Sequence, residues 1–287
     1  MEATDPLQQD HRARSDFVRD LVQRSSASVG RVITSPQEVP RRIARFWNDP
    51  NQLPPDVKEC IESWKKLEDK GFELLLFDDG NASQFIRAKL GPRYERAYAA
   101  CYHPAMQSDY FRLCFILVEG GCYLDADDVY SGRPVDHYFS DGRLGVQPLC
   151  YDLATDHMIP PSVFTRPTAY APSWIFYFNN NPLISVRRHP IIEKALARAT
   201  EALERPAVGE LPEIQSTTGP GNLTQTIVDH GTETGATEEM LLVLHDWESV
   251  ASTKWPLGYR SDARNWRLSN RQAYPRMSAQ TKSEWSG

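Results

Sequence analysis

Long apolar runs are missing from this sequence of 287 residues. None approaches the roughly 18 residues that a membrane-spanning helix needs, and residues 1–30 are polar and charged, without the apolar centre of a signal peptide. Basic residues are not in excess either, because 32 Lys and Arg stand against 38 Asp and Glu, a formal charge of −6. We therefore expect no transmembrane segment and no general surface for nucleic acid or anionic membranes.

Closely spaced cysteines are also missing. The five cysteines include no Cys-x-x-Cys pair, and Cys114 and Cys122 lie within apolar runs, where a cysteine behaves as a small buried hydrophobic residue. This usage is typical of a reducing compartment. Together with the polar residues 1–30, it predicts a cytoplasmic protein.

The remaining composition is that of a globular protein, with 40% hydrophobic and 24% charged residues. Residues 1–30 predict a helical and flexible extension that packs on the body or on a second copy, which would make a homodimer. Residues 31–287 predict one domain. Its last segment, about 246–287, has few aliphatic residues and is expected to form a C-terminal flap.

Strand and helix signals alternate from residue 40 onward. Residues 42–47 have strand character, residues 72–77 form a short apolar run, and apolar residues recur at helical spacing over 55–69. Two further helices are expected near 81–89 and 92–101. This alternation predicts an α/β fold in which a mostly parallel sheet is flanked by helices. Further strands are expected near 144–149, 174–178 and 240–244, helices near 190–203 and 219–228, and a substrate-covering loop over 150–173.

Residues 104–119 predict a buried helix that begins at a proline and ends at Gly120 and Gly121. Asp109 and Arg112 lie three residues apart and share one face of this helix. Charged side chains in a buried helix need partners or a polar cavity, because an unpaired buried charge is very costly. The pair therefore indicates a functional site.

A strand expected over 122–127 ends at the carboxylates of Asp125 and Asp127. Residues two apart in an extended strand point to the same side, so both could bind one divalent cation. Two carboxylates rarely hold such an ion alone, and water and a substrate phosphate would then complete its ligands. Ligands of open α/β sheets bind outside the carboxyl ends of the strands, so we expect a nucleotide-sugar site there.

The central block resembles a known family. Residues 105–127 are similar, nearly residue for residue, to the pattern A-x-x-S-D-x-x-R-x-x-x-L-x-x-x-G-G-x-Y-x-D-x-D of the family 32 glycosyltransferases, whose sugar-binding region contains a DXD motif. Residues 39–47 resemble the opening pattern of that family, I-P-K-I-I-H-Q-x-W. The family includes yeast α-1,6-mannosyltransferases and bacterial capsular polysaccharide enzymes, and is related to the large clostridial glucosylating toxins.

The resemblance implies a GT-A fold and a retaining transfer of a hexose from a UDP- or GDP-linked donor, with Mn²⁺ or Mg²⁺ as cofactor. By motif position, Trp47 stacks on the base, Asp109 and Arg112 bind the donor sugar, and Tyr123 lines the same pocket. Asp125 contacts ribose or sugar and a metal-bound water. Asp127 ligates the metal directly.

Several assignments stay open. Arg45 and Phe46 replace the His-Gln of the family, and Asp128 adds a third acid beside the motif. Asn180 either contacts the donor or caps a turn. The late residue that completes the metal and diphosphate site is His245, Asp246 or Ser252, with Trp255 as a further donor contact, although His245 and Trp255 could also be structural.

Two alternatives are compatible with parts of the pattern. A haloacid-dehalogenase-type phosphatase would use Asp125 as nucleophile and Asp127 as acid, but its motif normally ends the first strand of the domain. A non-catalytic protein that binds carbohydrate or nucleotide-sugar would keep the site without turnover. The intact set of four charged residues argues against the second alternative.

Overall fold

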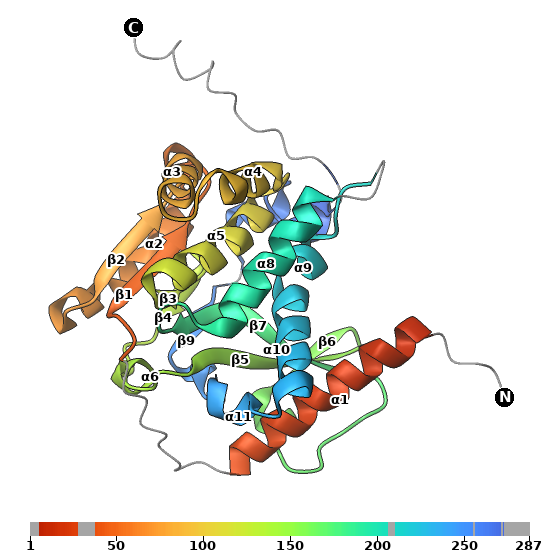
Figure 1. Ribbon diagram of the computed structural model, residues 1–287. Helices are drawn as coiled ribbons and strands as arrows, with labels where there is room; N and C mark the ends of the chain where they lie inside the picture. The colour runs from red at the N-terminus through yellow and green to blue at the C-terminus, as the bar shows by residue number, and fades with distance from the viewer. Residues whose placement is uncertain (1–5, 28–37, 206–209, 255, 271, 273–287) are drawn as a thin grey trace, which may run out of the picture.

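A seven-stranded sheet forms the centre of the computed structural model, which describes residues 6–27, 38–205, 210–254, 256–270 and 272 (Figure 1). Its strands follow the order β2-β1-β3-β7-β5-β6, and β8 pairs with β5 outside this path. The strands of this sheet are β1 (Arg42–Phe46), β2 (Glu73–Phe77), β3 (Gly121–Tyr123), β5 (Leu144–Asp152), β6 (His157–Ile159), β7 (Trp174–Ser185) and β8 (Leu241–Val243).

Most strands of the sheet run in one direction. β1 is parallel to β2 and β3, and β5 is parallel to β8. β7 lies antiparallel between β3 and β5, and β6 is antiparallel to β5. Because β7 separates two sets that share a direction, β2, β1, β3, β5 and β8 all run the same way. The predicted α/β fold with a mostly parallel sheet is confirmed.

Helices cover one face of the sheet and form the larger core with it. The buried α5 packs between the sheet and α8, and α10 lies against β7 (Figure 1). The helices of this layer are α1 (Pro6–Ala27), α3 (Asp79–Leu90), α4 (Pro92–Ala100), α5 (Pro104–Glu119), α8 (Pro190–Glu204) and α10 (Pro220–Thr234).

The other face of the sheet carries a second core around Trp64. The elements packed there include α2 (Pro55–Ser63), the 3₁₀ helix η2 (Trp64–Lys70), α6 (Asp136–Phe139) and a small antiparallel pair, β4 (Asp128–Tyr130) with β9 (Ala251–Thr253). The remaining short elements are η1 (Pro50–Gln52), α7 (Pro161–Phe164), α9 (Ile214–Thr217), α11 (Thr237–Met240), η3 (Trp247–Ser249), η4 (Gly258–Ser261) and α12 (Trp266–Ser269).

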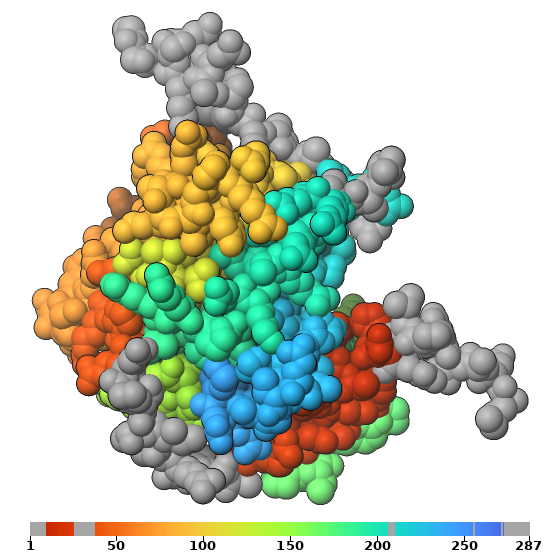
Figure 2. Space-filling model, in the orientation of Figure 1, coloured from red at the N-terminus to blue at the C-terminus, as the bar shows by residue number. Residues whose placement is uncertain are grey.

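The predicted N-terminal extension contains a 22-residue helix, α1, that packs on the body of its own chain. Val18, Leu21 and Val22 are fully buried in the larger core, and the Oγ of Ser15 accepts a hydrogen bond from the amide of Phe176 in β7 at 3.0 Å. Figure 2 shows α1 lying along the surface beside the end of α10. Of the two expected partners of this helix, the structure shows the body. The joint expected after it falls on residues 28–37, outside the described part.

Three predicted elements differ from the structure. β3 ends at Tyr123 and does not reach the carboxylates. The expected loop over 150–173 contains the end of β5, the strand β6 and α7, because β5 continues to Asp152 and pairs with both β6 and β7. β7 runs through the three asparagines 179–181 instead of ending before them. In the described part of the chain, no helix combines the length and apolar character needed to cross a membrane.

The glycines after α5 allow its chain to return as β3. Gly120 and Gly121 have φ angles of 62° and 97°, which disfavour residues with a side chain. A Cβ on Gly121 would lie 2.6 Å from the carbonyl oxygen of Arg42. The close approach of β3 to β1 therefore requires glycine, and it places the residues after β3 beside the end of β1.

Candidate functional site

A cavity of about 830 Å³ lies at the carboxyl ends of β1 and β3. Its wall is built by the end of β1, the first half of α5, the β3–β4 turn, the middle of β7 and the segment 247–267. Six of the predicted site residues line it: Trp47, Asp109, Arg112, Asp125, Asp127 and Asn180. Segments far apart in the sequence therefore converge on the place where a ligand was expected.

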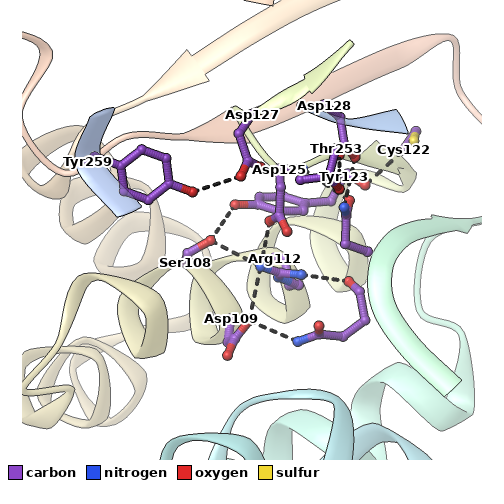
Figure 3. Close-up of polar contacts among 12 residues, drawn as sticks. Ser108, Asp109, Arg112, Cys122, Tyr123, Asp125, Asp127, Asp128, Thr253 and Tyr259 are labelled. Atoms are coloured by element: carbon purple, nitrogen blue, oxygen red, sulfur yellow. Dashed lines mark hydrogen bonds and ion pairs between the residues drawn. The ribbon is translucent and has the colours of Figure 1, made fainter. Parts of the chain in front are cut away.

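Arg112 is the centre of the polar network (Figure 3). Its Nη2 lies 2.9 Å from the Oδ1 atoms of both Asp109 and Asp125, and its Nη1 donates to the carbonyl of Asn180 at 2.7 Å. The Arg112 guanidinium also stacks 4.5 Å above the ring of Tyr123. Tyr123 was expected to line the cavity. Instead it is fully buried, and its ring packs against the guanidinium of Arg112.

Asp109 is held in a fixed position by its neighbours. Its Oδ1 accepts a hydrogen bond from the side-chain amide of Asn180 at 2.8 Å. Asn180 therefore contacts a predicted site residue from inside strand β7, and it does not cap a turn. Burial raises the pKa of Asp109 to about 6, although the positive charge of Arg112 opposes the shift. The carboxylate thus has directed hydrogen-bonding groups and little water around it.

The two motif carboxylates lie on a turn between β3 and β4. The expected extended strand, in which residues two apart point to one side, is therefore wrong for Asp125 and Asp127, although both face the cavity. Asn181 determines this turn: its Oδ1 accepts from the amide of Asp125 at 3.0 Å, and its Nδ2 donates to Asp128 at 2.8 Å. Asp125 and Asp127 thus face the cavity because Asn181 of β7 holds the turn, and not because the chain is extended there.

Asp128, the extra acid, ties the turn to β9. Its second oxygen accepts from the hydroxyl of Thr253 at 2.9 Å, and its carbonyl accepts from the indole of Trp64 at 2.9 Å. Burial, together with the charges of Asp127 and Asp125, raises the pKa of Asp128 to about 7. Since both of its oxygens are hydrogen-bonded within the protein, Asp128 has a structural role in this turn.

Asp127 contacts two residues that were not predicted as its partners. The hydroxyl of Tyr259 donates to its Oδ2 at 2.7 Å (Figure 3), and the guanidinium of Arg260 forms an ion pair with the same oxygen. The side chain of Asp127 is only 8% exposed. The segment around η4 therefore covers the second carboxylate of the motif.

Trp47 lies beside the same segment. The ring of Tyr259 meets it edge to face, with 5.3 Å between centroids, and the guanidinium of Arg264 lies 6.0 Å from its ring. The indole Nε1 of Trp47 is buried and has no hydrogen-bond partner among the described residues. Trp47 thus contributes to the wall of the cavity, with its indole donor enclosed by the protein.

The late candidates separate in space. His245 does not reach the carboxylates: its Nε2 lies 3.0 Å from the Oγ of Ser25 in α1, because the turn after β8 directs it toward that helix. Asp246 accepts a hydrogen bond from the hydroxyl of Tyr138 at 2.7 Å. Ser252, on β9, lines the cavity. Trp255 lies outside the described residues.

The carboxylates at the cavity are suited to a hard divalent cation such as Mn²⁺ or Mg²⁺, which prefers oxygen ligands. In the described residues, no group of three or more His, Cys, Asp or Glu side chains could hold a metal ion alone. Asp125 and Asp127 therefore fit such an ion only together with further oxygen ligands, from water or a substrate.

Comparison with known proteins supports the resemblance of the central block. The model of a family described as a glycosyltransferase sugar-binding region containing a DXD motif matches residues 54–140. No curated protein matches the sequence. Two solved structures are similar: the PaToxG glycosyltransferase (18% identity, TM-score 0.45, 90% of this chain and 94% of that one) and the catalytic domain of alpha-toxin from Clostridium novyi (10% identity, TM-score 0.48, 98% and 92%).

The matched region contains both halves of the network at the cavity. It includes α5 with Asp109 and Arg112, and the turn with Asp125 and Asp127. Residues 54–140 therefore match the sugar-binding region of glycosyltransferases with a DXD motif, and the protein is a glycosyltransferase.

Proposed function

We propose that this glycosyltransferase has a GT-A-type fold and transfers a hexose from a UDP- or GDP-linked donor to an acceptor, with retention of configuration. The observation that carries the proposal is the convergence of the Asp109–Arg112 pair with the carboxylates of Asp125 and Asp127 on one cavity. Retention is supported by the resemblance of residues 105–127 to family 32, and we assign no side chain as a nucleophile.

The donor sugar would be bound by Asp109 and Arg112. Their positions are fixed before any ligand arrives, because Asn180 contacts both side chains and Tyr123 supports the guanidinium. Groups that are held in place in a dry site interact strongly with a ligand and need little rearrangement during the reaction. Asp109 would accept hydrogen bonds from sugar hydroxyls, and Arg112 would keep Asp109 and Asp125 at a constant separation.

The diphosphate would lie near the turn between β3 and β4. Asp127 and Asp125 are the residues that would hold Mn²⁺ or Mg²⁺ there, and Ser252 on β9 is the late candidate that lines the cavity. When bound, such an ion neutralises negative charge on a diphosphate leaving group. Trp47, which lines the cavity, would stack on the base.

An assay of donor hydrolysis tests this proposal. The purified protein is incubated with a panel of UDP- and GDP-hexoses and Mn²⁺, and released nucleoside diphosphate is measured. Asp127→Ala should lower turnover by about 10²-fold or more, since an ionic ligand at the reacting group is lost. Asp136→Ala, which removes an exposed carboxylate paired with Arg41 outside the cavity, serves as the matched control and should retain turnover.

Two results would contradict the proposal. Full activity of Asp127→Ala after removal of metal by a chelator would exclude the metal role of this carboxylate. Release of phosphate from simple phosphomonoesters, without cleavage of any nucleotide-sugar, would favour the phosphatase alternative.

A further inference from the structure

Arg260 forms an ion pair with the carboxylate that we propose as the metal ligand. Its guanidinium and the hydroxyl of Tyr259 both contact the Oδ2 of Asp127. The side chain of Arg260 is 13% exposed and lines the cavity, and its carbonyl accepts a hydrogen bond from the side chain of Asn265 at 2.7 Å, which fixes the backbone of this turn. The ion pair between Arg260 and Asp127 is therefore enclosed, and each of the two residues is held by a further hydrogen bond.

A divalent cation bound to this oxygen would lie close to the guanidinium of Arg260 and be repelled by it. Both carry positive charge, and charges repel strongly where little water is present. The carboxylates of Asp125 and Asp128 are next to Asp127 in the turn, and Arg112 is already paired with Asp125 and Asp109. Arg260 is thus the cationic side chain that pairs with Asp127.

We infer that Arg260 is a positioning residue that competes with the divalent cation for Asp127 and leaves it when a nucleoside diphosphate arrives. This inference rests on the proposed function, because it assumes that Asp127 binds the metal. The diphosphate would supply the anionic oxygens that Arg260 needs as a new partner, since guanidinium groups bind phosphate well. The cation would then take the place beside Asp127.

Competition of this kind has a thermodynamic consequence. The cation alone must displace Arg260, so it binds weakly, whereas diphosphate draws Arg260 away and strengthens cation binding. Such an effect is reciprocal, so the cation must strengthen diphosphate binding by the same factor. Part of the cooperativity between metal binding and nucleotide binding would therefore come from the release of Arg260 from Asp127.

Binding of Mn²⁺, followed by the electron paramagnetic resonance signal of the free ion, tests the inference without an activity assay. Arg260→Gln should bind Mn²⁺ alone about tenfold more tightly than the wild type, the change expected when one charge-assisted hydrogen bond no longer competes. The factor by which UDP or GDP increases Mn²⁺ affinity should become smaller in this variant. Arg260→Lys keeps a positive charge and should stay near the wild type.

Arg264→Gln is the matched control, because Arg264 belongs to the same segment but pairs with Asp262. It should leave Mn²⁺ affinity unchanged, and thermal unfolding of all variants verifies that they are folded. Unchanged or weaker Mn²⁺ binding by Arg260→Gln, in a protein whose Mn²⁺ binding is lost in Asp127→Asn, would overturn the inference but not the metal site. Absence of Mn²⁺ binding to the wild type with either nucleotide would refute the metal role itself, and the inference with it.

Discussion

At the scale of single residues, Asn181 holds the turn that carries the motif carboxylates. Its amide joins the backbone of Asp125 to the side chain of Asp128, so one neutral residue sets the turn between two acids. An asparagine suits this task because its side chain has an acceptor and a donor. A carboxylate in its place could not donate to Asp128, and a hydrophobic side chain could satisfy neither group.

Replacing Asn181 by alanine should lower the free energy of unfolding by about 1–3 kcal/mol, since a buried amide and a buried carboxylate oxygen lose their partners. Asn179→Ala is the control, because Asn179 donates a long hydrogen bond, 3.4 Å, to Gln147. Urea unfolding of the two variants and the wild type measures the difference. Equal losses in both variants would show that the turn does not depend on Asn181.

The residues of the central motif could be predicted from the sequence, and their partners could not. Asp109, Arg112, Asp125 and Asp127 lie within 19 consecutive positions, counted from 109 to 127, so local spacing and resemblance identified them. Tyr259 contacts Asp127 from 132 positions away. No local pattern indicates such a contact, because it depends on how the whole chain folds. Asn181 could have been suspected from the sequence, because its neighbour Asn180 was already a candidate site residue.

At the scale of elements, β7 has two roles. It connects β3 and β5 within the sheet, and it carries the asparagines that contact the site. Its first half pairs with the end of β5, and its second half pairs with both the start of β5 and β3. The asparagines between these halves lie at the site. The sequence predicted a strand of five residues here, because three consecutive asparagines are unusual in a strand. Their side chains are accepted because Asn180 and Asn181 have charged partners on α5 and on the β3–β4 turn.

The junction of α5 with β3 should be very sensitive to substitution. Gly121→Ala places a Cβ 2.6 Å from the backbone oxygen of Arg42, whereas Gly132→Ala at a similar φ, 91°, meets no atom within 4 Å. Both changes impose the strain of a positive φ, so the difference between them isolates the steric clash. We expect Gly121→Ala to unfold with about 1–3 kcal/mol less free energy than Gly132→Ala. Comparable urea midpoints for the two variants would contradict this explanation.

At the scale of the whole molecule, α1 is part of the folded body rather than an appendage. Its apolar residues belong to the same core as α5, α8 and α10. The amphipathic pattern of residues 17–22 predicts a helix with one apolar face, but periodicity does not identify the surface that covers this face. The contacts with β7 and α10 identify that surface.

Leu21→Ala should therefore destabilise the whole protein by about 2–5 kcal/mol, as expected for a large side chain removed from a packed core. Asp20→Ala removes a neighbouring side chain that is 57% exposed, and should change stability by about 0.5 kcal/mol or less. Circular dichroism in the far and near ultraviolet, recorded during urea unfolding, measures both effects. A separate early transition of α1, with the midpoint of the main transition unchanged, would show that this helix is an independent unit.

The pairing of Asp127 with Arg260 has a consequence for biosynthesis. The partners are 133 positions apart, so at roughly 5–20 residues per second the ribosome needs on the order of ten seconds between making one and making the other. This wall of the cavity therefore forms only after residue 260 has been translated, well after the acids of the turn.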